Sequence, residues 1–366
     1  MNGVKRRLQR RLRREHRPDP DALPKSSTEA VPALADYDPD AGLPFDAAEL
    51  EQRIVWIWGS PRSGSTWLLR QLCYPLFPEP EATTIFRAPG AGKNWKRPFD
   101  AIPVDESFIS NHLAPAFADP REVDGSYVPG TINNYLGERP VYAYSNAYRA
   151  VWAPEARRFA LVRLHGFLAR LRAEAIATTA DPLLIVKEVN GSHAADLVMG
   201  LMPRSRLLFL VRDGRDVVDS LLHAYQPGGF LARHQGYSYS TPGERLEGVA
   251  WAARLWSCNI DMTLRAIDAH PAELSHTVRY EDLLSENELR IEQLHTWLGL
   301  ERTAAERHRM LADTAFVSVP SKRRGATERN RSAKPGLWRE NLNDEEQRTC
   351  MEIMGPRLKR LGYEIN

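Results

Sequence analysis

The stretch IVWIWGSPRSGSTWLLRQL, residues 54–72, decides the fold. It opens with a short, continuous apolar run that ends at Gly59, which is typical of a strand buried on both faces. A glycine-rich loop follows, and then a helical pattern with Leu68, Leu72 and Leu76 on one side. Strand, glycine loop and helix in this order form the context that a phosphate-binding loop needs.

The loop departs from the usual phosphate-loop pattern GxxxxGK[ST], because Ser65 stands where the lysine belongs and Arg62 lies inside the loop. Backbone N–H groups at such a turn bind anions, and the dipole of the following helix assists them. Ser63, Gly64, Ser65 and Thr66 offer backbone and hydroxyl donors, and Arg62 offers a permanent, forked cation. An ordinary strand-to-helix turn would not need so many donors, so we predict that this loop binds phosphate or sulfate groups.

Strands alternate with helices along the rest of the chain. Further apolar runs indicate strands within residues 181–191, 206–212 and 276–284, and helical patterns occupy residues 154–178, 192–203, 217–225, 244–270, 285–300 and 343–361. We expect Pro154 in the first turn of one helix and a capping box of Ser285 and Glu288 at the start of another. The alternation predicts a three-layer α/β/α fold with a central parallel sheet of four or five strands.

Composition predicts one folded body behind a basic tail. The chain is 43% hydrophobic and 26% charged, as is ordinary for a soluble globular enzyme. The first 17 residues hold eight Lys and Arg residues and one Glu, and residues 18–45 are rich in Pro, Asp and Ala. We predict that residues 1–45 are a disordered tail and linker, and that residues 46–366 form a single domain. A weak contact of the tail with an anionic membrane surface is the alternative to a free tail.

Several classes of protein are disfavoured. The net charge is +2 and the basic tail accounts for it, so the body shows no sign of nucleic-acid binding. The chain has no apolar run long enough for a transmembrane helix and no apolar segment after the tail that would make a signal peptide, so we expect a cytoplasmic protein. Cys73, Cys258 and Cys350 are far apart, which predicts free thiols and no metal site.

Four segments together resemble the sulfotransferases that use 3′-phosphoadenosine 5′-phosphosulfate (PAPS). SPRSGSTW (60–67) resembles the loop that holds the 5′-phosphosulfate, and VRDGRDVVDS (211–220) carries the family's strand-end Arg and its Ser eight residues later, here Arg212 and Ser220. RYEDLL (279–284) is similar to the segment whose tyrosine, here Tyr280, lies near the adenine. The resemblance implies that Arg212 and Ser220 clamp the 3′-phosphate, a group that ATP lacks.

The fourth segment, RSAKPGLWREN (331–341), resembles the family's C-terminal stretch that closes over the 3′-phosphate. Arg331 matches the family pattern, whereas Ser332 and Ala333 replace its Lys and Gly. The resemblance therefore implies a donor site that includes Arg331 and Ser332, with a weaker closure than usual.

The resemblance also implies an activity, which is metal-free, in-line transfer of the sulfuryl group from PAPS to an acceptor hydroxyl, with 3′,5′-adenosine bisphosphate (PAP) as product. Arg62 would stabilise charge on the leaving phosphate, Trp67 would pack on the adenine, and Lys187 would line the site at a strand end. The implied donor contacts in the loop are Arg62, Ser63, Gly64, Ser65, Thr66 and Trp67.

Three residues compete for the role of general base. The histidine that one branch of the family uses is replaced here by Val189. Other branches use a glutamate about twenty residues after the loop cation, and Glu81, nineteen residues after Arg62, is therefore the first candidate. Glu188 is the second and His193 the third. This pattern favours a carbohydrate, glycolipid or peptide acceptor, without naming it.

The acceptor pocket is expected in residues 79–150 and in a lid-like loop at 226–243. These segments hold tyrosines that stack on an acceptor or pack in the core, namely Tyr142, Tyr144, Tyr148, Tyr237 and Tyr239. The oligomeric state stays open.

Two rival functions also stay open. A P-loop nucleotide kinase or NTPase would need ATP and magnesium, and it would not need Arg212 or Ser220. A non-catalytic nucleotide-binding protein would bind PAP tightly and turn over no acceptor.

Overall fold

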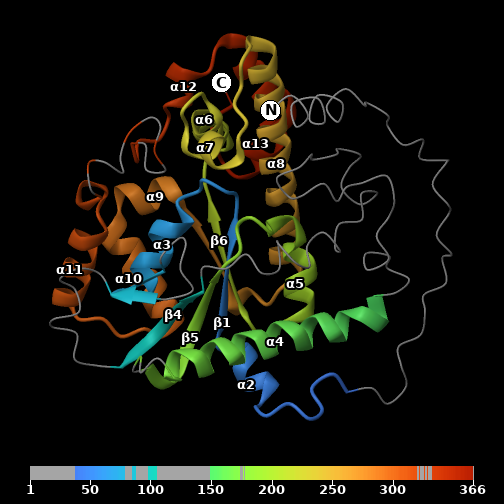
Figure 1. Cartoon of the computed structure of the whole chain (residues 1–366), viewed down its shortest axis with the longest axis vertical. Coiled ribbons are helices and arrows are strands. Elements are labelled where there is room, and N and C mark those ends of the chain that lie inside the picture. The colour runs from blue at the N-terminus through green and yellow to red at the C-terminus, as the bar shows by residue number, and fades with distance from the viewer. Residues whose placement is uncertain are drawn as a thin grey trace.

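The computed structural model describes residues 38–78, 85–87, 98–104, 149–173, 176, 178–319, 321, 325, 328 and 332–365. Its centre is a five-stranded sheet in the order β4-β5-β1-β6-β7, in which every pairing is parallel (Figure 1). Its strands are β1 (Ile54–Gly59), β4 (Phe99–Val104), β5 (Thr178–Lys187), β6 (Arg206–Val211) and β7 (Ser275–Arg279). Strands β2 (Leu76–Pro78) and β3 (Ile85–Arg87) form a separate antiparallel pair.

Helices cover both faces of the sheet, so the predicted three-layer α/β/α architecture is confirmed. One face is covered by α3 (Ser65–Leu72), α9 (Tyr280–Ser285), α10 (Asn287–Leu298) and α11 (Ala304–Thr314). The hydrophobic cluster on the other face of the sheet contains residues of α2 (Ala47–Gln52), α4 (Arg149–Ala173), α5 (Ala195–Leu201), α6 (Gly214–Tyr225), α8 (Pro242–Ala269) and α13 (Asp344–Arg360). The remaining short elements are α7 (Phe230–Gln235), α12 (Trp338–Asn341) and the 3₁₀ turns η6 (Ser192–Ala194), η7 (Ala272–Leu274) and η8 (Phe316–Ser318).

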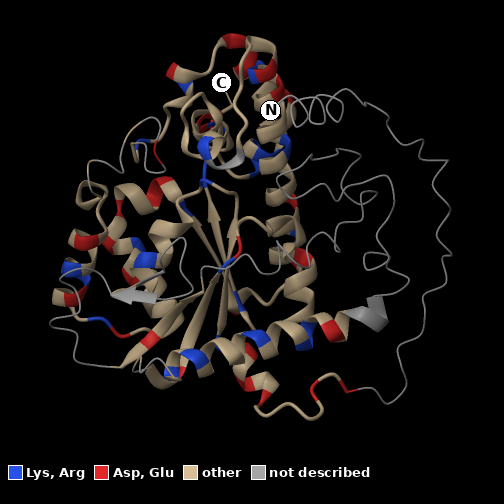
Figure 2. Cartoon of the chain, in the orientation of Figure 1, with Lys and Arg blue, Asp and Glu red and all other residues tan. Residues whose placement is uncertain are grey.

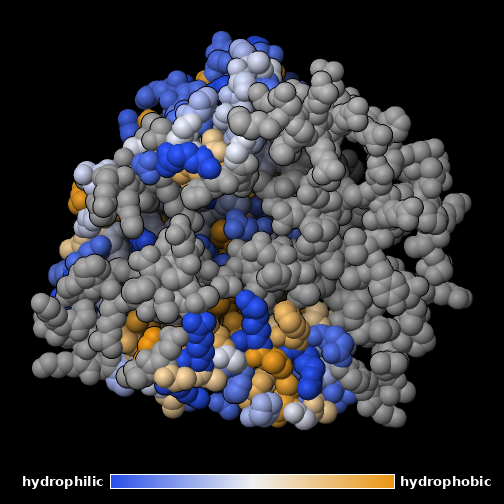
Figure 3. Space-filling model, in the orientation of Figure 1, coloured by the Kyte–Doolittle hydropathy of each residue, from blue (hydrophilic) through white to orange (hydrophobic). Residues whose placement is uncertain are grey.

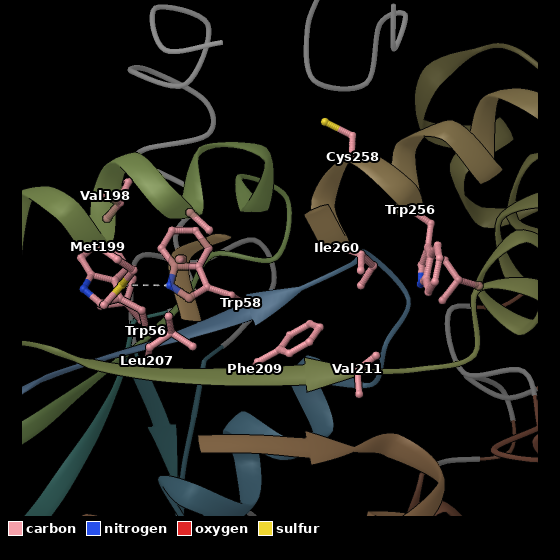
Figure 4. Packing of buried hydrophobic residues seen from close by; sticks show 14 of the residues in the cluster. Trp56, Trp58, Val198, Met199, Leu207, Phe209, Val211, Trp256, Cys258 and Ile260 are labelled. Carbon is pink, nitrogen blue, oxygen red and sulfur yellow. Dashed lines mark hydrogen bonds between the residues drawn. The ribbon is translucent and has the colours of Figure 1, made fainter. Parts of the chain in front are cut away.

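Strand β1 lies in the middle of the sheet, and all six of its residues are buried. Trp56 and Trp58 pack in the cluster with α5 and α8, where the indole N–H of Trp58 lies 3.2 Å from the sulfur of Met199 (Figure 4). Val55 and Ile57 pack in the cluster on the α3 face. Both faces of β1 are apolar because both are covered, which explains the unbroken apolar run in the sequence.

Two local predictions were wrong. Ser285 is the last residue of α9, and α10 starts after Glu286 without a side-chain cap, so Ser285 and Glu288 form no capping box. Helix α4 begins at Arg149, which puts Pro154 inside the helix instead of in its first turn. As the sixth residue of α4, Pro154 costs the helix one backbone hydrogen bond, and the helix extends past it to Arg149.

Other predictions concern parts that the structure leaves undescribed. Residues 1–37 lie outside the described residues, so the disordered tail, its membrane contact and the division into tail and domain stay predictions. In the part that is described, no helix combines the length and apolarity needed to span a bilayer. All three cysteines are buried and free of disulfides. On the face seen in Figure 3, hydrophobic residues gather near α4, where Phe159 is 44% exposed.

Candidate active site

The loop after β1 adopts a conformation that needs its glycines. Gly59 has φ +150°, and a Cβ there would lie 2.3 Å from the carbonyl oxygen of Leu210 on β6. Gly64 has φ +89° and precedes α3, which starts at Ser65 with no side-chain cap. Since the first N–H groups of a helix have no partner inside it, the start of α3 offers donors to an anion.

Two hydroxyl groups of this loop are buried and have no hydrogen-bond partner among the described residues. They belong to Ser60 and Ser63, whose side chains are almost inaccessible. Ser63 is one of the predicted donor contacts, whereas Ser60 is not among the predicted residues. A buried hydroxyl without a partner costs free energy, so both groups fit a site in which a ligand supplies the missing acceptor.

Arg62 and Arg212 meet where the loop faces α6. The Nε of Arg62 donates to the hydroxyl of Ser220 at 3.0 Å, and its guanidinium lies 5.0 Å from the ring centroid of Phe230. An Nη of Arg212 donates to the carbonyl oxygen of Arg62 at 2.9 Å. Three predicted site residues, one from the loop and two from the segment 211–220, are therefore in direct contact. Figure 2 shows basic residues at this end of the central strands.

An aromatic pair borders the loop on its other side. Tyr280, the first residue of α9, packs so closely that a Cβ on Gly64 would lie 2.7 Å from its ring. Trp67 meets Tyr280 edge to face at 6.1 Å between centroids, and Arg212 lies 4.5 Å from the centroid of the same ring. Burial raises the pKa of Tyr280, with Arg212 opposing the shift, so the phenol is neutral. The predicted adenine contacts Trp67 and Tyr280 thus lie together.

Lys187 reaches the loop from the end of β5. Its Nζ donates to the hydroxyl of Thr66 at 3.1 Å, and the side chain is buried. The neighbour of Lys187, Glu188, is fully buried, and strand alternation assigns it to the opposite face of the sheet. His193 lies buried in the 3₁₀ turn that follows. The structure therefore brings Lys187 to the loop.

Other candidates have different positions. Val189, which replaces the family's histidine, packs in the hydrophobic cluster on the α3 face. Tyr237 and Tyr239 pack against each other and against Tyr225, with ring centroids 5.7 to 6.3 Å apart, so they form an aromatic cluster at the end of α6. Glu81, Arg331, Tyr142, Tyr144 and Tyr148 lie outside the described residues.

The C-terminal segment lies against α6. The backbone N–H groups of Gly336 and Trp338 donate to the carboxylate of Asp216 at 2.8 and 3.4 Å. Burial raises the pKa of Asp216, while Arg212, 4.0 Å away, lowers it. Ser332, a predicted donor contact, begins this described segment. Asp216 is not among the predicted residues: its place four residues after Arg212 puts it on the same side of α6, but its backbone partners lie in a distant part of the sequence.

The site is cationic, and its cations are side chains. Arg62, Lys187 and Arg212 surround an uncapped helix start, an arrangement that holds a ligand with more than one anionic group. Within the described ranges, no group of three or more His, Cys, Asp or Glu residues is arranged to hold a metal ion.

Comparison with known proteins gives the family. No curated protein matches the sequence. Similar solved structures include mouse sulfotransferase SULT7A1 complexed with PAP (12% identity, 84% of this chain and 85% of that chain, TM-score 0.47) and sulfotransferase STF9 from Mycobacterium avium (14% identity, 85% and 77%, TM-score 0.44). The model of the sulfotransferase family matches residues 55–304, which is more than half of the chain. The chain therefore belongs to the sulfotransferase family.

Proposed function

We propose that this sulfotransferase takes the sulfuryl group from PAPS and transfers it to an acceptor hydroxyl by in-line displacement, leaving PAP. The observation that carries the proposal is the contact of Arg62 with Ser220 and of Arg212 with the carbonyl oxygen of Arg62. These residues join the phosphate-binding loop to a second cationic position, as a donor with a 5′-phosphosulfate and a 3′-phosphate requires. An ATP-dependent enzyme has no use for the second position.

The loop residues supply the 5′ subsite of this proposal. The N–H groups at the start of α3 and the hydroxyls of Ser60 and Ser63 donate to phosphate oxygens. Arg62 stabilises the charge that grows on the leaving phosphate as the bond to sulfur breaks. Lys187, held at Thr66, adds a second positive charge next to the loop.

The 3′ subsite combines Arg212 with Ser220. Arg62 donates to the oxygen of Ser220, so the O–H of Ser220 keeps its proton for a phosphate oxygen. The Nε of Arg212 is buried without a hydrogen-bond partner among the described residues, which leaves it as a donor for the same phosphate. Trp67 and Tyr280 lie beside this subsite, where they would contact the adenine.

The acceptor half of the proposal rests on the sequence. Glu81 stays the first candidate for the base, ahead of Glu188 and His193, and a carbohydrate, glycolipid or peptide hydroxyl stays the favoured acceptor. Replacing each of the three with its neutral amide-bearing counterpart, Glu81→Gln, Glu188→Gln and His193→Gln, and measuring kcat against pH identifies the base, because only its loss removes the acidic limb of the profile.

The experiment that tests the function is a calorimetric titration with PAP, ADP and ATP–Mg²⁺, followed by PAP release from PAPS with a panel of sugar, glycolipid and tyrosine-peptide acceptors. We expect PAP to bind at least about tenfold tighter than ADP, since a phosphate held by charge-assisted hydrogen bonds is worth about 1.5–3 kcal/mol. Tighter binding of ATP–Mg²⁺ would instead indicate an NTPase. Tight PAP binding without turnover on any acceptor would indicate a non-catalytic nucleotide-binding protein.

A further inference from the structure

On one side of α6, an acidic residue lies between the two residues assigned to the 3′-phosphate. Arg212, Asp216 and Ser220 follow one another at intervals of four, so they lie on the same side of the helix and of the turn before it. Asp216 is 1% exposed, and it stands between the arginine and the serine. A buried carboxylate at this place needs partners of its own, because an unpaired buried charge is strongly destabilising.

The partners of Asp216 come from the far end of the chain. Its Oδ2 accepts the N–H of Gly336 at 2.8 Å, and its Oδ1 faces the N–H of Trp338 at 3.4 Å. Gly336 has φ +80°, so these two bonds hold a left-handed turn in the chain. The same Oδ2 lies 4.0 Å from Arg212. One carboxylate therefore contacts both the C-terminal segment around Gly336 and the arginine of the 3′ subsite.

Further contacts fix the segment on both sides of this turn. The Asn341 side chain donates to Asp219, the other buried acid on α6, at 3.2 Å. The guanidinium of Arg215 lies 4.0 Å from the ring centroid of Trp338. Helix α12 is thus held along α6, and Asp216 holds the turn at Gly336, four residues after Ser332.

We propose that Asp216 is a positioning residue for the donor: it latches residues 332–338 onto α6 next to Arg212, so that binding of the 3′-phosphate and closure of this segment stabilise each other. The proposal rests on the proposed function, because it assigns the segment to the 3′-phosphate. Asp216 touches no donor atom in this scheme and acts through Arg212 and the backbone of the segment. The coupling is reciprocal: a change that loosens the segment weakens binding of the 3′-phosphate, and loss of the 3′-phosphate loosens the segment.

The test compares the affinities of PAP and ADP in wild type, Asp216→Asn and a control. Asparagine has nearly the same shape, but it loses the charge, and its NH₂ group faces either a backbone N–H or Arg212. We expect the ratio of the ADP Kd to the PAP Kd to fall about tenfold in Asp216→Asn, as befits the loss of charge-assisted bonds. Asp261→Asn breaks the ion pair of Asp261 with Arg357 between α8 and α13, and it should leave that ratio unchanged.

A second readout follows amide hydrogen exchange in residues 332–342. In the wild type, PAP should slow exchange at Gly336 and Trp338 more than ADP does, whereas in Asp216→Asn these amides should exchange rapidly with either ligand. Should Asp216→Asn fail to fold, Asn341→Ala loosens the same segment from Asp219, and a smaller fall in the Kd ratio is expected.

The outcomes separate the two proposals. A wild type that prefers PAP and an Asp216→Asn variant with the same preference and the same exchange would overturn the latch and leave the donor assignment intact. A wild type without preference for PAP over ADP would overturn the donor assignment and the latch with it. An equal weakening of PAP and ADP in Asp216→Asn would show a structural role only, which also contradicts the latch.

Discussion

Replacing Arg212 with alanine should distinguish two contributions of this side chain to nucleotide affinity: its contact with the 3′-phosphate and its support of the loop. Arg212 is 10% exposed, and one Nη donates to the carbonyl oxygen of Arg62 at 2.9 Å. Its guanidinium lies 4.5 Å from the ring centroid of Tyr280. The Nε has no hydrogen-bond partner among the described residues, so Arg212 has donor capacity that the described part of the chain does not use.

The expected magnitude follows from these contacts. The bond to the Arg62 carbonyl helps to hold the loop, and losing it should weaken ADP and PAP alike, by about 0.5–1.5 kcal/mol. The bonds to the 3′-phosphate exist only with PAP and are charge-assisted, so PAP should lose a further 2 kcal/mol or so, about 30-fold in Kd. The ratio of the two affinities isolates the second contribution.

The assay is calorimetric titration of both nucleotides into wild type, Arg212→Ala and Arg212→Lys. Lysine restores the charge without the planar fork, so it should recover part of the PAP preference. Arg357→Ala, which breaks the ion pair with Asp261, serves as the control for removal of a partly buried arginine. Equal losses for PAP and ADP in Arg212→Ala would refute the reasoning, because Arg212 would then only hold the loop.

Three further predictions concern the loop, the strand end and a buried histidine. Gly64→Ala adds a Cβ at φ +89° that would lie 2.7 Å from the ring of Tyr280, so thermal unfolding should show a loss of about 1–3 kcal/mol, and an unchanged Tm would contradict the geometry. Lys187→Met keeps the apolar stem beside Thr66 but removes the charge, so kcat in a PAPS assay should fall at least about tenfold with Tm nearly unchanged; a fall in Tm alone would make Lys187 structural. Burial lowers the pKa of His295 to about 3 from 6.5, so the unfolded state binds the extra proton and stability is lost as the pH falls below 6.5. Urea unfolding at pH 7 and 5 should show a smaller loss in His295→Gln than in wild type, by up to about 1.4 kcal/mol per pH unit; equal losses would place the titration elsewhere.

The parts of the fold that the sequence predicts are those in which local pattern and tertiary position agree. The run in β1 is apolar on both sides because α3 covers one face and α5 and α8 the other. The sequence pattern does not predict strand β4, because Asp100 and Pro103 interrupt its apolar run. Pro103 is tolerated because β4 is an edge strand, where a missing N–H need not break a ladder. Asp100 is tolerated because its carboxylate pairs with Arg302 at 2.6 Å.

The candidate site divides in the same way. The loop at residues 60–67 and the pair of Arg212 and Ser220 stand out in the sequence because, within each of these two segments, the spacing of the residues is fixed by a short connection. Asp216 does not, because its partners Gly336 and Trp338 come from the other end of the chain, and no local pattern records a carboxylate that binds backbone N–H groups. Ser60 likewise does not stand out, because the sequence does not reveal that this loop serine is buried.

The order of the strands also governs how this chain must assemble. Strand β1 is made first, yet Ile54 pairs in register with Leu184 and Val55 with Arg206. During synthesis the run IVWIW, which is apolar on both faces, therefore stays unpaired until the ribosome has released both neighbouring strands. Parallel pairing between such distant segments makes folding slow. A strongly apolar segment left exposed in the meantime is prone to aggregate. Lower growth temperature and slower synthesis should therefore raise the soluble yield more than changes to the surface of the folded protein.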